Sequence, residues 1–256
     1  MRGQPARYND LVKAVAALLT CALAASAESP VRVEYTCPPE DVESFGLPCT
    51  PEEPCPVFLE LSSVDAAGAT LAVAGDLHTE RTTLWGILLQ SDDGGKSWTE
   101  PLKRLRAAAY EQIQFLDFGY GWVSGEIIEP LPKDPFLLLT TDGGKSWSQR
   151  PVFEDSRFAS IAQFWFDSRT TGKLVLDHPQ GAAPKHEVYE THTGGESWEV
   201  SHVSDQPVAL PGVRSKEAAT WRIRAEASSK TYRLERRGSP NWETVASFVI
   251  HVADCK

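Results

Sequence analysis

The stretch Ser91-Asp92-Asp93-Gly94-Gly95-Lys96-Ser97-Trp98 occurs three times in this chain with small changes. The second copy is Thr140-Thr141-Asp142-Gly143-Gly144-Lys145-Ser146-Trp147, and the third is Thr191-His192-Thr193-Gly194-Gly195-Glu196-Ser197-Trp198. The tryptophans of successive copies lie 49 and then 51 residues apart. Apolar residues precede each copy and a short strand-like stretch follows it, which is the pattern of two strands joined by a tight turn. The chain is therefore predicted to consist of repeated structural units.

Turn chemistry accounts for every position of this motif. Glycine adopts a positive φ without steric cost, and an aspartate carboxylate can accept hydrogen bonds from backbone N–H groups two residues on. The hydroxyl side chains can hold the same turn, and the tryptophan can pack against the sheet. The third copy has Thr193 in place of the aspartate, an exchange that a catalytic carboxylate would not allow. The motif residues are therefore predicted to be structural: Ser91, Asp93, Gly95, Ser97, Trp98, Thr140, Asp142, Gly144, Ser146, Trp147, Thr191, Gly195, Ser197 and Trp198.

A repeat of this length with one hairpin turn per unit is typical of a β-propeller blade. We predict an all-β propeller of four four-stranded antiparallel blades, at residues 57–104, 105–153, 154–203 and 204–252. The last blade is degenerate, and Trp242 takes the place of the motif tryptophan. The segment Val31–Tyr35 is left over as a spare strand that can complete the last blade. A ring of five blades and an open arc that pairs with a second copy are the alternatives.

The motif resembles the Asp-box, or BNR repeat, written Ser/Thr-x-Asp-x-Gly-x-Thr/Ser-Trp. Asp-boxes occur in sialidases, in sortilin-type receptors and in the photosystem II assembly factor family known as Ycf48/HCF136. Residues 112–125 are similar to the Phe-x-Asp-x-x-x-Gly-Trp-x-x-Gly half of a Ycf48-like blade. The resemblance covers roughly residues 57–200 well and the rest weakly. It implies an architecture and not an activity, because that family mixes assembly factors with uncharacterised secreted proteins.

The N-terminus has the pattern of a secretory signal peptide. Basic residues precede an apolar run at 11–23, and Ala25-Ser26-Ala27 forms a small-x-small cleavage site. The apolar run is short for a transmembrane helix, so an uncleaved anchor is the less favoured alternative. We predict that residues 1–27 are removed and that the mature chain is secreted or periplasmic, with no integral membrane span. Lipidation at Cys21 is not expected, because the residue before a lipoprotein cysteine is usually small.

Four cysteines remain after this cleavage: Cys37, Cys49, Cys55 and Cys255. An even number in an oxidising compartment indicates two disulfides, for which three connectivities exist. Cys49 and Cys55 bracket a short turn-prone loop within the Cys/Pro-rich segment 28–56, so they are natural partners. Cys37 and Cys255 would then join the two ends of the chain, which a closed propeller brings together. Free thiols or a metal site are the alternative, although no Cys-x-x-Cys is present for zinc.

The chain is acidic, with 35 acidic and 25 basic residues and a net charge of −10. This balance argues against nucleic acid or anionic lipid as a partner. One basic stretch includes Arg222 and Arg224, which strand alternation places on one face. That face is either an ordinary solvated surface or a cationic rim that docks an acidic partner.

No catalytic set could be assigned. The arginine triad and the Phe/Tyr-Arg-Ile-Pro motif of sialidases are missing, and the carboxylates Glu126, Glu129 and Asp134 are expected to be solvated in a loop between strands. Asp177, His178 and His186 flank one loop, but their spacing matches no metal-ligand pattern. No phosphate-binding glycine loop exists. We therefore predict no metal and no cofactor.

The sequence thus predicts an exported, non-catalytic binding or assembly module for a protein or glycan outside the cytoplasm. The alternative is a sialidase-like glycoside hydrolase or a carbohydrate-binding protein. Loops on one face of a propeller are the usual binding surface, and the longest here are 76–83, 127–135 and 177–186. The middle loop is stiffened by prolines, although it could also be an ordinary connection. The predicted partner-binding residues are Ile127, Ile128, Pro130, Leu131, Pro132, Pro135, Arg222 and Arg224.

Overall fold

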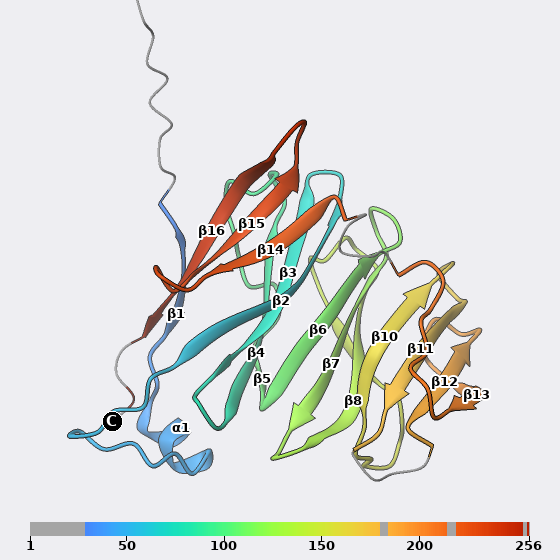
Figure 1. Cartoon of the computed structure of the whole chain (residues 1–256), viewed down its shortest axis with the longest axis horizontal. Coiled ribbons are helices and arrows are strands. Elements are labelled where there is room, and N and C mark those ends of the chain that lie inside the picture. Colours follow the sequence, from blue (N-terminus) through green and yellow to red (C-terminus); the bar gives the residue numbers. More distant parts are fainter. Residues whose placement is uncertain (1–28, 180–183, 214–218, 253–254, 256) are drawn as a thin grey trace, which may run out of the picture.

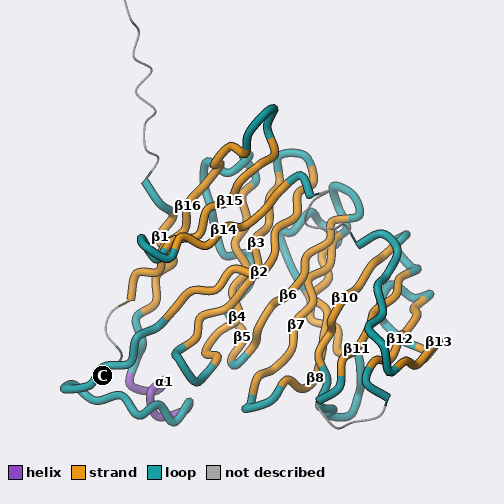
Figure 2. Tube along the Cα trace, viewed as in Figure 1, coloured by secondary structure: helices purple, strands orange, loops and turns teal. Residues whose placement is uncertain are grey.

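The computed structural model describes residues 29–179, 184–213, 219–252 and 255. The predicted signal peptide lies outside these residues. In the described part of the chain, sixteen strands form four separate four-stranded sheets, accompanied by one short helix, α1 (Pro39–Ser44) (Figure 1). The tube in Figure 2 shows that strands make up most of the trace and that turns connect them at the ends of the sheets. The prediction of an all-β, propeller-like fold of four blades is confirmed.

Three of the blades are formed by strands that are consecutive in the chain. Blade 1 contains β2 (Phe58–Ala67), β3 (Thr70–His78), β4 (Thr83–Ser91) and β5 (Leu105–Arg106). Blade 2 contains β6 (Ala108–Phe115), β7 (Gly121–Ile128), β8 (Pro132–Thr140) and β9 (Ser148–Pro151). Blade 3 contains β10 (Ser160–Phe166), β11 (Gly172–Asp177), β12 (His186–Thr191) and β13 (Glu199–Ser204).

Blade 4 is assembled from both ends of the chain. Its C-terminal strands are β14 (Trp221–Glu226), β15 (Thr231–Arg237) and β16 (Trp242–Val252). The spare strand predicted from the sequence, β1 (Val31–Tyr35), pairs with β16 as the outermost strand, and this pairing is parallel. The blades are therefore antiparallel except for this one pair, and no fifth sheet is present in the described residues.

The blades lie side by side as a fan in the order 4, 1, 2, 3 (Figure 1). Their first strands adjoin one another, because β14 packs on β2, β2 on β6, and β6 on β10. A cavity of about 270 Å³ is lined by residues from all four of these inner strands. The inner strands therefore converge on a shared axis, as they do in a propeller.

Side chains of one inner strand bond to the backbone of the next and fix how the blades align. The Gln114 amide donates to Phe166 O at 2.8 Å, and its oxygen accepts from Phe166 N at 2.8 Å. Ile113 N donates to Ser63 Oγ at 3.0 Å between blades 2 and 1. Apolar layers fill the spaces between the sheets, and Trp122 stacks flat on Phe166 with ring centroids 3.8 Å apart. Burial of such large rings stabilises the contact between two blades.

The repeated motif forms a closed hydrogen-bonded turn in each of the three blades. In blade 1 the Asp93 carboxylate accepts from Ser91 Oγ at 2.8 Å, from Ser97 N at 2.9 Å and from Ser97 Oγ at 2.7 Å. Trp98 Nε1 donates to Gly95 O at 3.0 Å, which folds the indole back over the turn. These donors, the Ser97 hydroxyl first, hold the pKa of Asp93 well below its usual range.

The third turn uses a hydroxyl where the first two use a carboxylate. Thr193 Oγ1 accepts from Ser197 N at 2.9 Å, as Asp142 Oδ1 accepts from Ser146 N at 3.0 Å in the second turn. Either side chain can therefore accept the bond that closes the turn.

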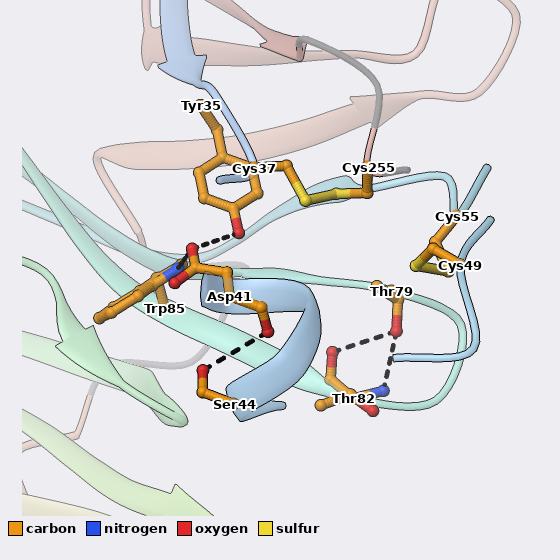
Figure 3. The surroundings of a disulfide bond; sticks show 10 residues. All are labelled: Tyr35, Cys37, Asp41, Ser44, Cys49, Cys55, Thr79, Thr82, Trp85 and Cys255. Carbon is orange, nitrogen blue, oxygen red and sulfur yellow. Dashed lines mark hydrogen bonds between the residues drawn. A yellow bond between two sulfur atoms is a disulfide. The ribbon is translucent and has the colours of Figure 1, made fainter. Parts of the chain in front are cut away.

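Both predicted disulfides are present, Cys37–Cys255 and Cys49–Cys55 (Figure 3). Tyr35 lies opposite Val252 in the parallel pair of β1 and β16, so both strands end at the same place and Cys37 meets Cys255 just beyond them. The termini are joined because they share one sheet. Closure of a ring, the reason given above, is not what brings them together.

Candidate binding cavity

A cavity of about 620 Å³ opens at the end of blades 1 and 2 that faces α1. Ser44 and Phe45 form one wall at the end of α1, and the loop 79–82 and the tip of the β7–β8 hairpin form others. Figure 3 shows α1 lying beside Thr79 and Thr82 of this loop. The ionisable residues that line the cavity are Glu60, Asp76, His78, Glu80, Arg81, Arg106, Glu111 and Glu129. Five carboxylates therefore face two arginines and one histidine.

Strand register places the carboxylates together. Glu60 lies directly opposite Asp76 in the pair β2–β3, immediately before a bulge between Leu61 and Ser63. Strands β6 and β7 have a bulge at the same position of blade 2. This bulge contains Glu111 and lies just beyond the point where Ala109 faces Glu126. Asp76 and Glu126 thus occupy corresponding positions of blades 1 and 2. Asp177, opposite Ser160, takes the same position in blade 3.

Asp76 is the buried carboxylate of the cavity wall. Its exposed fraction is 8 %, and burial raises its pKa to about 7. His78 lowers this pKa, whereas the negative charges of Glu60 and Glu111 raise it. Glu111 is more exposed, and partial loss of water at the cavity together with the charge of Glu60 raises its pKa as well. Carboxylates close together in a poorly hydrated site hold their protons more tightly, because each added charge repels the others.

The expectation that Glu126 is solvated is wrong. Its exposed fraction is 6 %, because β7 packs against β10 of blade 3. Burial, followed by the charge of Glu111, raises its pKa to about 8. One of its oxygens accepts from Ile161 N, and Oε2 has no hydrogen-bond partner in the described chain. Of the other two carboxylates, Glu129 is paired with Arg106 at 3.0 Å and Asp134 accepts from Arg157 N at 3.0 Å.

One of the two arginines of the lining, Arg106, is already neutralised. Arg106 Nη1 lies 3.0 Å from the Glu129 carboxylate, and Nη2 donates to Ser44 O at 2.6 Å. Its guanidinium also stacks over the Phe45 ring at 4.2 Å. Glu129 and Arg106 balance each other, so the excess negative charge lies on the side of Asp76.

The segment 127–135 is mostly strand, which corrects the prediction of a long loop. Ile127 and Ile128 belong to β7, Pro132 and Pro135 belong to β8, and only residues 129–131 connect them. In the same way, only residues 79–82 separate β3 from β4. Both tips nevertheless reach the same end of the blades, where they line the cavity together.

The hairpin tip separates two hollows. Ile128 and Pro130 line the large cavity, while Leu131 and Pro132 line a neighbouring one of about 400 Å³ with Asp177 and His178. The Leu131 side chain is 51 % exposed. Ile127 is half-buried and Pro135 is buried, so these two residues form part of the sheet.

Arg222 and Arg224 belong to a different surface. Arg222 Nε donates to the Glu235 carboxylate at 2.6 Å and its guanidinium stacks on Trp242 at 4.2 Å, so its charge is compensated. Arg224 is exposed farther along β14. Neither residue lines the large cavity, and the structure does not bring them together with the hairpin tip.

The histidine-flanked loop pairs its histidines with carboxylates. His186 Nδ1 bonds to Asp177, and His178 Nε2 lies 3.2 Å from Glu187. Part of this loop, residues 180–183, lies outside the described residues. In the described chain, no group of three or more histidine, cysteine or acidic side chains could hold a metal ion. No helix among the described residues is long and apolar enough to span a membrane.

Comparison with known proteins finds a sequence relative over part of the chain. No protein-family model matches the chain. The photosystem II assembly lipoprotein Ycf48 of Synechococcus sp. (strain CC9902) is 29 % identical over 118 residues, which cover 45 % of this chain and 31 % of the relative. The match therefore spans about a third of the length of that curated protein.

Solved structures with similar folds include YCF48 from Cyanidioschyzon merolae, with a TM-score of 0.40, 16 % identity, and coverage of 75 % of this chain and 57 % of that one. A second is YCF48 bound to D1 peptide, with a TM-score of 0.41, 20 % identity, and coverage of 75 % and 56 %. A third is the α-L-arabinofuranosidase Arb93A from Fusarium graminearum, with a TM-score of 0.38, 15 % identity, and coverage of 76 % and 59 %.

Four consecutive four-stranded blades, three of them closed by the same turn motif, define a β-propeller-type repeat protein. Within that class the chain is similar to Ycf48 over the matched 118 residues, in agreement with the resemblance noted from its turn motif.

Proposed function

We propose that the protein is an exported, non-catalytic assembly module that binds a protein partner at the cavity end of blades 1 and 2. The sequence relative is an assembly factor by name. Two disulfides are compatible with an oxidising compartment outside the cytoplasm. Export through the signal peptide at residues 1–27 is part of this proposal.

The observation that carries the proposal is the β7–β8 hairpin tip. Leu131 is a large apolar side chain, half of its surface is open to solvent, and Pro130 and Pro132 flank it. Prolines limit the conformations of the tip before binding, so less entropy is lost when a partner orders it. A partner that covers Leu131 would bury this apolar surface, which favours binding at the tip.

The test is capture of partners from the exported fraction under non-reducing conditions, with the full mature chain as bait. We expect one dominant protein with the wild-type chain and its loss with Leu131→Asp. The matched control is Val200→Asp, because Val200 is 53 % exposed on β13 of blade 3 and is equally apolar. Capture that survives Leu131→Asp, or that is lost equally with Val200→Asp, would contradict the proposal.

A glycoside hydrolase is the second candidate, favoured by one observation. Asp76 and Glu126 have pKa values raised to about 7 and about 8, and a protonated carboxyl of this kind can serve as a general acid. We expect no turnover of aryl-arabinoside, aryl-xyloside or aryl-sialoside substrates. Turnover that is abolished by Asp76→Asn would replace the binding proposal with an enzymatic one.

A further inference from the structure

We propose that the 620 Å³ cavity receives one cationic side chain, a lysine or arginine, from the partner protein. This inference rests on the proposed function and names the chemistry of its partner. The cavity would accept the cationic group against the carboxylate of Asp76, between Glu60 and Glu111.

Asp76 is the first reason. Its exposed fraction is 8 %, it lines the cavity, and no hydrogen bond from a described residue to its carboxylate is among the influences on its pKa. Burial has removed most of the water around this carboxylate without putting a protein donor in its place, which costs free energy. An incoming ammonium or guanidinium group would supply the missing donors and a compensating charge.

The surrounding charges are the second reason. The groups that face Asp76 are Glu60 from β2, His78 from β3 and Glu111 from β6. His78 Nε2 is 3.7 Å from Glu60, while Glu111 has an exposed side chain at the cavity. Glu80, Arg81, Arg106 and Glu129 lie farther along the lining, where Arg106 is held by Glu129. The net field in the cavity is therefore negative and attracts a cation.

Other occupants fit this lining less well. An anion would meet five carboxylates. A sugar ring usually stacks on an aromatic face, and the aromatic ring in the lining, Phe45, is covered by the Arg106 guanidinium. The described residues offer no group of ligands arranged for a metal ion. A single long cationic side chain uses the negative field and leaves the tip at 129–131 free to contact the rest of the partner.

The test measures binding of small probes to the full mature chain by nuclear magnetic resonance. The probes are N-acetyl-lysine methylamide and N-acetyl-arginine methylamide. Their neutral isosteres, N-acetyl-norleucine methylamide and N-acetyl-citrulline methylamide, are the controls. We expect at least one cationic probe to shift the amide signals of Asp76 and Glu111, with affinity at least tenfold above that of its isostere.

Variants locate the effect. Asp76→Asn keeps the shape of the side chain and removes its charge, so we expect at least tenfold weaker binding. Glu111→Gln is a second variant at an exposed position, where loss of folding is less of a concern, and it should weaken binding in the same direction. Asp205→Asn, at an exposed carboxylate after β13, should leave the affinity unchanged.

The affinity should also depend on pH. The pKa of Asp76, about 7, implies that the carboxylate loses its charge below neutrality, so binding of a cation should weaken from pH 8 to pH 6. In Asp76→Asn this weakening should be smaller.

Three results would overturn the inference. The first is equal binding of the cationic and neutral probes, and the second is unchanged affinity in Asp76→Asn. The third is a response of the Asp76 signal to calcium chloride or arabinobiose but not to the lysine and arginine probes. The proposed function fails separately. Cation binding can be absent while Leu131→Asp still abolishes partner capture, and partner capture can be independent of Leu131 while the cation binds.

Discussion

At the scale of single residues, the turn aspartates and the cavity carboxylates are opposite cases. Asp142 is exposed and accepts bonds from Thr140 Oγ1 and from the backbone and hydroxyl of Ser146, and these donors lower its pKa to about 2. Glu126 is buried and its pKa is raised to about 8. Folding therefore favours ionisation of Asp142 and disfavours ionisation of Glu126.

Asp142→Ala should destabilise the fold, because Ser146 N and Thr140 Oγ1 lose their acceptor. We expect a loss of about 1 kcal/mol in the free energy of unfolding, reduced by solvent exposure. Asp142→Thr should lose less, since Thr193 makes the corresponding bond in blade 3. Urea unfolding at pH 6 measures both. The loss should shrink below pH 4 and vanish as the pH falls through about 2, where the folded-state carboxylate is itself protonated. Equal stability of wild type and Asp142→Ala at pH 6 would contradict this.

Glu126→Gln should stabilise the fold at high pH. The folded-state pKa of Glu126 is above that of an ordinary glutamate, so the folded chain binds the proton more tightly than the unfolded chain does. Stability from this group is therefore greatest below about pH 4 and is lost as the pH rises toward 8. We expect Glu126→Gln to be about 2 kcal/mol more stable than wild type at pH 8 and equal to it near pH 4. Thermal unfolding of both proteins from pH 4 to pH 8 measures this. A difference in stability between Glu126→Gln and wild type that does not change with pH would contradict the prediction.

The turn residues could be predicted from the sequence because their chemistry is local. Asp93, Gly95 and Ser97 lie within four residues of their partners. The cavity carboxylates come together through strand register and through bulges, neither of which has a short-range signal. One signal was available: Asp76, Glu126 and Asp177 recur at the period of the repeat.

At the scale of elements, the β7–β8 hairpin shows why prolines misled the sequence interpretation. Proline lacks the N–H that a sheet ladder needs, so three prolines within residues 130–135 indicated a loop. The strands accommodate them because Pro132 stands at the start of β8 and Pro135 falls in a register shift opposite Glu126. Asp134, with a φ of 50°, makes the local change of direction. A bulge therefore allows prolines in a strand from which they are usually excluded.

The strand β1 and its disulfide lead to a prediction about the two cysteine pairs. Cys37 and Cys255 are 218 residues apart, whereas Cys49 and Cys55 are 6 apart. A cross-link over a longer loop removes more entropy from the unfolded chain. We expect replacement of the first pair by serine to cost about 4–5 kcal/mol and replacement of the second about 2 kcal/mol, measured by urea unfolding. A larger loss of unfolding free energy on replacing the Cys49–Cys55 pair would contradict this expectation.

At the scale of the whole molecule, four blades form a fan whose first and last strands share one sheet. The number of blades could be predicted from the period of the turn motif in blades 1 to 3 and from the strand pattern of the last blade. The prediction that Trp242 takes the place of the motif tryptophan is wrong, because Trp242 begins β16, the third strand of blade 4, whereas the motif follows the third strand of the other blades. Val31–Tyr35 could be predicted as a strand that completes the last blade, but no local pattern indicates that its pairing with β16 is parallel. The arrangement brings the tips of blades 1 and 2 and α1 to one end, where the carboxylate-lined cavity opens.

The central claim is that this end of the molecule binds a protein. Site-specific photo-crosslinking in the exporting host tests it most directly, with a benzoylphenylalanine placed at position 131 and, as the control, at position 200. The account predicts one discrete protein adduct from position 131 and none from position 200. A shared adduct pattern at both positions, or an adduct only from position 200, would contradict it.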